Sequence, residues 1–144
     1  TADLTSASWT LDANLERNDT AGFSVLGTGM SESSGIFTFP STGYWWILLS
    51  QYVIGNADNR AVYGRVCTTV DNSNYICNVT GGSVARVETN YTADHVTANT
   101  IFDVTDVTTH KCKFTGSTSA TTVIVAGDST AQRTGMTFIR LAST

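Results

Sequence analysis

The sequence is poor in charge, in proline and in the residues that favour helices. Only 14% of its 144 residues are charged, whereas about a quarter is usual in a globular domain. Leucine, glutamate and lysine are scarce, while threonine, which favours strands, and serine, which favours turns, supply most of the polarity. We therefore predict an all-β chain, and its length predicts a single domain over residues 1–144.

A basic surface is missing too. The net charge is −4 and the isoelectric point about 4.8, which argues against nucleic acid or an anionic membrane as a partner. No apolar run approaches the ~20 residues that span a bilayer, so no membrane insertion is expected. The first residues lack an initiator methionine and the charged and apolar regions of a secretion signal. We expect an excised or mature domain, the C-terminal head of a longer chain.

The three cysteines are odd in number, so at least one thiol is free. Cys67 and Cys77 can pair across a hairpin, but the favoured interpretation is that all three, including Cys112, are free and packed as small core residues. A reducing site of synthesis fits this interpretation best. We accordingly expect no disulfide that is needed for folding.

One hairpin, residues 35–54, dominates the sequence. Phe37 and Phe39 alternate with Ile36 and Thr38, as in a strand with one buried face, and the only proline then ends this strand. The second strand of the hairpin does not alternate, because residues 44–49 read Tyr-Trp-Trp-Ile-Leu-Leu.

An unbroken apolar run indicates a strand that is covered on both faces. Helices usually provide that cover, but the sequence contains no convincing helix. We therefore predict that the inner sheet of a β-sandwich faces the core on one side and another subunit on the other.

The rest of the chain reads as short strands separated by turns rich in glycine, serine and asparagine. Strands are predicted at residues 8–15, 22–26, 61–70, 75–79, 83–89, 100–107, 110–115, 121–126 and 135–141. Loops or turns are predicted at residues 17–20, 27–35, 55–59, 71–74, 81–82 and 127–133, and residues 91–97 are ambiguous. With eight to ten strands, a sandwich or jelly roll is the expected architecture.

Three segments together resemble the C1q/TNF-like superfamily. They are Gly35-x-Phe-x-Phe-Pro-x-x-Gly-Tyr-Trp-Trp-Ile, Thr100-Ile-Phe-Asp-Val with Lys111-Cys-Lys-Phe, and Gly127-Asp-Ser-Thr followed by Gly135-Met-Thr-Phe-Ile-Arg-Leu. The sequence departs from the family at Trp45 and Trp46, where Tyr and Phe are more usual, at Ile47, where Phe is common, and in having no collagen-like repeat.

The resemblance implies an antiparallel jelly roll of about ten strands that forms a tight homotrimer, with aromatic strands around the three-fold axis. On that basis Tyr44, Trp46, Leu48 and Phe138 are expected at the trimer interface. Collagen-free members similar to this chain occur at the tips of viral and phage fibres. This implies a virion surface appendage, with an extracellular location as the alternative.

Catalytic and metal-binding motifs are weak throughout, so no enzyme activity and no cofactor are expected. His95 and His110 do not have metal-ligand spacing. Asp106, His110 and Cys112 can meet near one turn as a zinc site, although exposed strand ends are the favoured interpretation. Asp103 and Asp106 are the pair that glycoside hydrolysis would need.

Calcium remains a minor alternative, since it takes several oxygen ligands. The carboxylates that would supply them are Asp94, Asp103, Asp106 and Asp128, and solvated loop acids are the favoured interpretation.

The loops are the expected recognition surface. Tyr75 and Tyr91, with Asn72 and Asn74, are predicted to bind a host surface glycan or protein through stacking and hydrogen bonds. The predicted function is the receptor-binding head of a viral or phage tail fibre. The alternatives are a structural trimerisation or capping domain without its own ligand and, less favoured, a small hydrolase on a jelly-roll scaffold.

Overall fold

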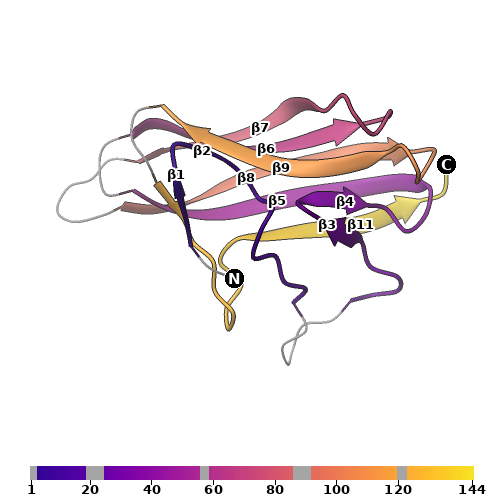
Figure 1. Cartoon of the computed structure of the whole chain (residues 1–144), viewed down its shortest axis with the longest axis horizontal. Helices are drawn as coiled ribbons and strands as arrows, with labels where there is room; N and C mark the ends of the chain where they lie inside the picture. The colour runs from indigo at the N-terminus through magenta and orange to yellow at the C-terminus, as the bar shows by residue number, and fades with distance from the viewer. Residues whose placement is uncertain (1–2, 19–24, 56–58, 86–91, 120–122) are drawn as a thin grey trace.

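The computed structural model describes residues 3–18, 25–55, 59–85, 92–119 and 123–144. These residues form eleven strands, and no helix occurs among them. The strands lie in two antiparallel sheets stacked face to face (Figure 1). The predicted all-β sandwich of about ten strands is therefore confirmed. The predicted strand at residues 22–26 lies mostly outside the described residues.

Sheet A is built around β5 (Gly43–Gly55). β8 (Thr92–Val104) pairs with the whole length of β5 on one side. On the other side, β11 (Gly135–Ala142) pairs with the first part of β5 and β10 (Val123–Val125) with its end. β1 (Leu4–Ser6) then pairs with β10.

Sheet B has the strand order β3 (Ser31–Ser33), β4 (Ile36–Thr38), β9 (Lys111–Thr118), β6 (Asn59–Thr69) and β7 (Ile76–Ala85), and β2 (Ser8–Thr10) also pairs with β9. The chain passes between the sheets from β4 to β5, β5 to β6, β7 to β8, β8 to β9 and β9 to β10. These repeated crossings are compatible with a jelly roll.

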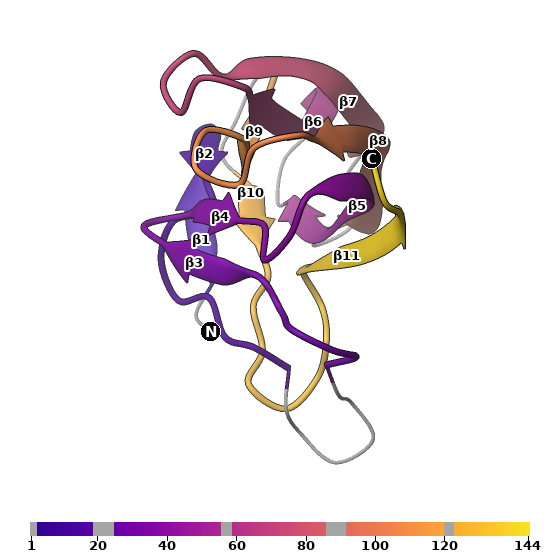
Figure 2. The same ribbon diagram turned by 90° about the vertical axis from the view of Figure 1, so that its right-hand side faces the viewer.

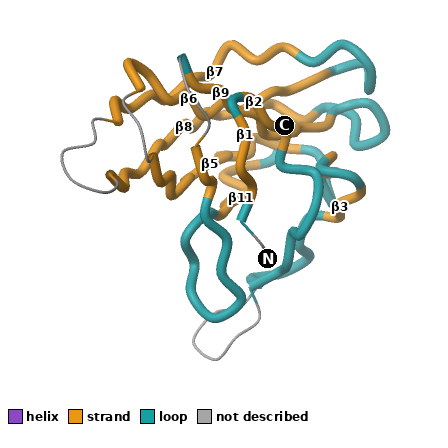
Figure 3. Tube along the Cα trace, turned by 60° about the vertical axis from the view of Figure 1, so that its left-hand side comes forward, coloured by secondary structure: helices purple, strands orange, loops and turns teal. Residues whose placement is uncertain are grey.

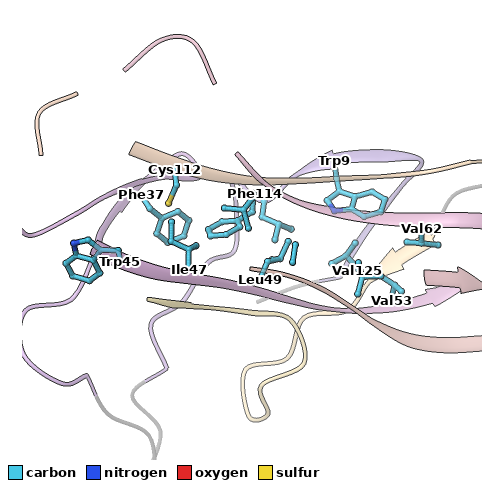
Figure 4. Packing of buried hydrophobic residues seen from close by; sticks show 14 of the residues in the cluster. Trp9, Phe37, Trp45, Ile47, Leu49, Val53, Val62, Cys112, Phe114 and Val125 are labelled. Atoms are coloured by element: carbon cyan, nitrogen blue, oxygen red, sulfur yellow. The ribbon is translucent and has the colours of Figure 1, made fainter. Parts of the chain in front are cut away.

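The core lies between the two sheets (Figure 4). Along β5, Trp45, Ile47, Leu49 and Val53 point inward and are buried, as a strand with a period of two requires. Phe114 of β9 meets them from sheet B. Burial of a side chain such as Ile47 or Leu49 contributes roughly 1.5–3 kcal/mol to stability.

Several predicted boundaries were wrong. The strand expected at residues 8–15 ends at Thr10, and although Leu11 is buried, Ala13 is exposed. β3 lies inside the predicted loop at 27–35. Gly81 and Gly82, predicted to turn the chain, lie inside β7, which continues through both. Lys111, at the start of β9, is buried, and its Nζ donates to the Val107 carbonyl at 2.6 Å.

The expectation of free thiols was wrong for two of the three cysteines. Cys67 of β6 and Cys77 of β7 form a disulfide across the β6–β7 hairpin. Cys112 alone is free and buried, and burial raises the pKa of its thiol. The inference of a reducing site of synthesis loses its support, because disulfides persist mainly in oxidising compartments.

Reduction of the Cys67–Cys77 disulfide is expected to lower the free energy of unfolding by roughly 2–3 kcal/mol, since it frees a short loop in the unfolded chain. Chemical denaturation with and without reductant measures this loss. The Cys67→Ser/Cys77→Ser variant should behave like the reduced protein and should not respond to reductant. Equal stability of the oxidised and reduced wild type would contradict the prediction.

Candidate functional site

The outer face of sheet A, which points away from the core, carries an apolar patch. At its centre is Trp46 of β5, paired across the sheet with Ile101 of β8 and Ile139 of β11. Leu48 and Tyr44 flank it on the same face of β5. The exposed fractions are 61% for Ile101, 46% for Ile139 and 41% for Tyr44, whereas Trp46 and Leu48 are half-buried. We call these five residues the outer apolar patch.

The side chains of the unbroken apolar run at residues 44–49 therefore alternate between the two faces of sheet A. Its odd-numbered residues fill the core, and its even-numbered residues, which are half-buried or exposed, belong to the outer apolar patch. β11, next to this patch, pairs only with β5 among the described residues.

Phe138 lies apart from the other predicted interface residues. It pairs across the sheet with Ile47 and so points into the sandwich. Its ring centroid is 5.2 Å from that of Phe37 and 5.9 Å from that of Phe114. The structure thus brings Tyr44, Trp46 and Leu48 together on one face but places Phe138 on the opposite one.

Beyond Leu48 the same outer face becomes polar. Ser50 Oγ lies 3.3 Å from His95 Nδ1, and the Tyr52 and His95 rings are 5.0 Å apart between centroids. The guanidinium carbon of Arg133 lies 5.8 Å from the centre of the Tyr52 ring. Arg133 Nε in turn donates to Asp128 Oδ2 at 3.1 Å. A hydroxyl, an imidazole, a phenol and an ion pair therefore meet on one surface.

The loop between β10 and β11 holds Arg133 in place. Asp128 Oδ1 accepts hydrogen bonds from the backbone N–H and hydroxyl of Thr130, both at 2.8 Å, and from the N–H of Ala131 at 3.2 Å. These bonds hold the pKa of Asp128 below its ordinary value, and the bond from the Thr130 N–H has the largest effect. Thr134 Oγ1 accepts from the Tyr52 N–H at 3.1 Å, which ties the loop to β5.

The turn between β6 and β7 contains Asn72 and Asn74, both predicted to bind ligand. Asp71 accepts hydrogen bonds from the N–H of Asn74 at 2.7 Å, from its Nδ2 at 2.5 Å and from the N–H of Ser73 at 2.9 Å. The backbone of Asn72 is in the left-handed conformation, with φ +60°, and its N–H donates to the Thr109 carbonyl. The Asn74 amide therefore closes the turn, and the turn is anchored to the loop before β9.

Stability is expected to fall with acidification below about pH 4, partly because of this turn. Hydrogen bonds from the backbone and side chain of Asn74 and from the Ser73 N–H lower the folded-state pKa of Asp71 well below its ordinary value of 3.8. A depressed folded pKa stabilises the fold above the unfolded pKa, and that contribution is lost as the pH falls toward the folded pKa. Thermal melts of wild type and Asp71→Ala should differ near neutral pH and converge in strong acid; a constant difference would contradict this.

Of the two tyrosines predicted to bind ligand, the structure describes only Tyr75. Tyr75 is half-buried, and the Lys113 ammonium lies 4.3 Å from its ring centre. Its hydroxyl is buried without a hydrogen-bond partner among the described residues. Desolvation raises the pKa of Tyr75, and the electrostatic effect of the nearby Cys112 raises it further. Tyr91 lies outside the described residues.

The carboxylates considered for calcium do not gather. Asp94 and Asp103 are nine residues apart on β8, which separates them by roughly 30 Å. Asp106 accepts from the hydroxyl and N–H of Thr108, which lower its pKa, and Asp128 lies in the loop before β11. Within the described ranges, no group of three or more His, Cys, Asp or Glu side chains is placed to hold a metal ion.

The residues considered for zinc are likewise engaged separately. The ring nitrogens of His110 lie 3.2 Å from Thr105 Oγ1 and 3.1 Å from Thr109 Oγ1. Cys112 is buried in the core cluster. The His110 N–H donates to the Asp106 carbonyl at 2.9 Å, but the side chains of Asp106, His110 and Cys112 are not placed to hold a metal ion.

A cleft of about 1110 Å³ opens between the two sheets at the β4 and β11 edges. Its walls are formed by residues 11–18 and 25–30, which follow β2, and by residues 126–132, which precede β11. These described segments extend below the sheets in Figure 2 and Figure 3. The apolar lining of the cleft includes the half-buried side chains of Leu15, Met30, Met136 and Phe138. Trp45, also on this surface, is 6% exposed and donates through Nε1 to the Ser41 carbonyl, so it offers little aromatic surface to a ligand.

Sequence reasoning missed the polar half of the outer face. Ser50 and Tyr52 follow the apolar run on alternate positions of one strand, and that spacing is visible in the sequence. His95 and Arg133 join them only through the register of β5 with β8 and the course of the loop before β11, which the sequence does not reveal.

Comparison with protein-family models and with curated proteins gave no match. The resemblance to the C1q/TNF-like superfamily stays a prediction. The described part of the chain contains no helix with the length and hydropathy of a membrane span.

Proposed function

We propose that this chain is the trimeric, C1q/TNF-like receptor-binding head of a viral or phage tail fibre that recognises a host surface glycan or protein. The observation that carries the proposal is the outer apolar patch on sheet A. Contiguous apolar surface of this kind is uncommon on monomers and marks sites of association.

The composition of the patch favours an interface between copies of the chain. A tryptophan at its centre, with isoleucine, leucine and tyrosine around it, matches the aromatic and uncharged cores of subunit interfaces. β11 supports this further, since an edge strand with free backbone groups is normally shielded in the assembled protein. Closed cyclic symmetry is usual for homo-oligomers, and the family resemblance selects three subunits.

A trimer suits a recognition role. Three copies present identical surfaces in one direction, so that weak individual sites gain avidity on a repetitive cell surface. The Cys67–Cys77 disulfide is compatible with a location on a virion or outside the cell. The small number of charges favours recognition through hydrogen bonds and aromatic contact.

A structural trimerisation or capping domain without its own ligand is the second candidate. It is favoured by the turn at residues 71–74, where Asp71 and Asn74 bond to each other and so leave fewer groups for a ligand. In this case the outer apolar patch would have the same role, but no surface would bind a receptor.

Adsorption of purified protein to candidate host cells distinguishes the two functions. Light scattering first establishes the trimer, and a labelled sample is then mixed with cells and sedimented. Saturable adsorption that unlabelled protein displaces is expected for a receptor-binding head. A stable trimer that adsorbs to no host in a broad panel would contradict this function and leave the capping domain.

A further inference from the structure

The polar half of the outer face of sheet A contains a group of side chains that lies beyond the outer apolar patch. It consists of Ser50 and Tyr52 on β5, His95 on β8 and Arg133 in the loop before β11. We propose that this group, the Tyr52 cluster, binds a neutral sugar residue of a surface glycan. The inference rests on the receptor-binding function proposed above and names its site and ligand class.

The arrangement places polar groups around an aromatic ring. Tyr52 is half-exposed, with the His95 ring at 5.0 Å and the Arg133 guanidinium carbon at 5.8 Å from its centre. Ser50 Oγ lies 3.3 Å from His95 Nδ1. A sugar ring has an apolar C–H face bordered by hydroxyls, so an aromatic surface with nearby hydroxyl and imidazole groups complements both parts.

The cluster is held by the backbone of the fold. Tyr52 pairs directly with His95 in the β5–β8 register. The Tyr52 N–H donates to Thr134 Oγ1 at 3.1 Å, and its carbonyl accepts from Ala126 N–H at 2.8 Å. The ion pair with Asp128 orients Arg133. Recognition groups on paired strands need little ordering when the ligand binds.

The charges around the cluster favour an uncharged ligand. Arg133 is neutralised by Asp128 at 3.1 Å. Asp94, next to His95 in the sequence, pairs with the inward-pointing Val53 and accepts from the Ser83 hydroxyl of β7 in sheet B, so its side chain lies on the opposite face of β8 from the cluster. The Asp128–Arg133 pair leaves no surplus positive charge for a carboxylated sugar. Sugar hydroxyls both donate and accept hydrogen bonds, and the serine and tyrosine hydroxyls do the same.

The position of the cluster keeps it accessible in the proposed trimer. It begins at Ser50, directly after the outer apolar patch ends at Leu48. Charged residues are depleted in the centre of subunit interfaces, so an exposed histidine beside the Asp128–Arg133 ion pair belongs at or beyond the interface rim.

Ligand-observed NMR tests the site on the full chain. The probes are the methyl glycosides of glucose, galactose, mannose and N-acetylglucosamine, each alone, with methyl glucuronoside as the charged comparison. At least one neutral glycoside is expected to bind in the millimolar range. Tyr52→Ala should weaken that binding by at least about tenfold, and His95→Ala and Arg133→Ala should weaken it to a smaller degree.

Tyr63→Ala is the matched control. Tyr63 is a half-buried strand tyrosine on sheet B with Arg65 5.3 Å from its ring centre, so it repeats the Tyr–Arg contact outside the cluster. This variant should bind sugar as wild type does. If Tyr52→Ala does not fold, the test relies on the His95→Ala and Arg133→Ala variants, which change exposed side chains. Circular dichroism checks that each variant folds.

Three results would overturn the Tyr52 cluster as a sugar site. They are binding of none of the neutral glycosides, unchanged binding by all folded cluster variants, and tighter binding of the glucuronoside than of any neutral sugar. Each can be separated from failure of the receptor-binding function. A head that adsorbs to cells and loses adsorption in Tyr75→Ala, but not in Tyr52→Ala, retains its function and places recognition at the 71–75 turn.

Discussion

Replacement of Gly81 by alanine is expected to destabilise the fold by about 3 kcal/mol or more, the upper end of overpacking costs. A methyl group on Gly81 would overlap the backbone carbonyl oxygen of Thr97, where β7 and β8 bring the two sheets together. A side chain could move aside by changing rotamer, but a backbone carbonyl in a paired strand cannot do so without breaking its register. Thermal melts should show the midpoint falling by roughly 10 °C.

The neighbouring glycine provides the control. A methyl group on Gly82 would meet the Tyr63 ring at 3.5 Å and the Val62 carbonyl oxygen at 3.7 Å, and both are ordinary van der Waals contacts. The Gly82→Ala variant should therefore lie within about 1 kcal/mol of wild type, because alanine also reduces the entropy of the unfolded chain. Similar losses at the two positions would show that β7 does not approach β8 as described.

This glycine pair illustrates why part of the fold was not predictable. Two adjacent glycines usually mark a turn, and nothing local distinguishes that use from a close approach between strands. Gly81, Gly64 and Gly116 lie in one row across β7, β6 and β9, and a methyl group on Gly64 would stand 2.5 Å from the Gln51 amide oxygen. At Gly81 and Gly64 the need for glycine comes from the facing sheet, whereas at Gly116 it comes from the Trp9 ring of the neighbouring strand β2. No short window of sequence encodes the position of either neighbour.

Patterns within one strand were predictable. The alternation that buries Phe37 and Phe39 and exposes Ile36 is visible in four residues, and the structure confirms it. The strand at residues 61–70 and the turn that follows were also predicted correctly, because β-branched residues and then asparagine and aspartate have strong local preferences.

The candidate sites depended on pairing between distant segments. Ser50 and His95 are 45 residues apart, and Tyr52 and Thr134 are 82 apart, yet each pair shares a hydrogen bond. The prediction placed ligand binding on loops because loops commonly carry recognition. At the 71–74 turn, the same asparagine that suggested a ligand contact instead bonds to Asp71.

Introduction of a charge at the centre of the outer apolar patch is expected to dissociate the proposed trimer without unfolding the subunit. In the Trp46→Glu variant, a carboxylate would replace an indole that lies between Ile101 and Ile139. Trp46 is only half-buried in the single chain, so its loss should cost the isolated fold less than the roughly 3–5 kcal/mol typical of a buried tryptophan. Tryptophans central to interfaces often contribute at least about 2 kcal/mol to binding, and each of the three subunit contacts would lose that contribution.

Light scattering over a range of protein concentrations measures this effect. Wild type should have the mass of three subunits, and Trp46→Glu should have the mass of one while retaining the circular dichroism of a folded β protein. Tyr63→Glu, which places the same charge on the outer face of sheet B, should remain trimeric. A wild-type mass of one subunit at every concentration would contradict the proposed trimer. The outer apolar patch would then be exposed in solution without self-association. The avidity that the proposed function requires would also lose its basis, because avidity depends on several linked copies.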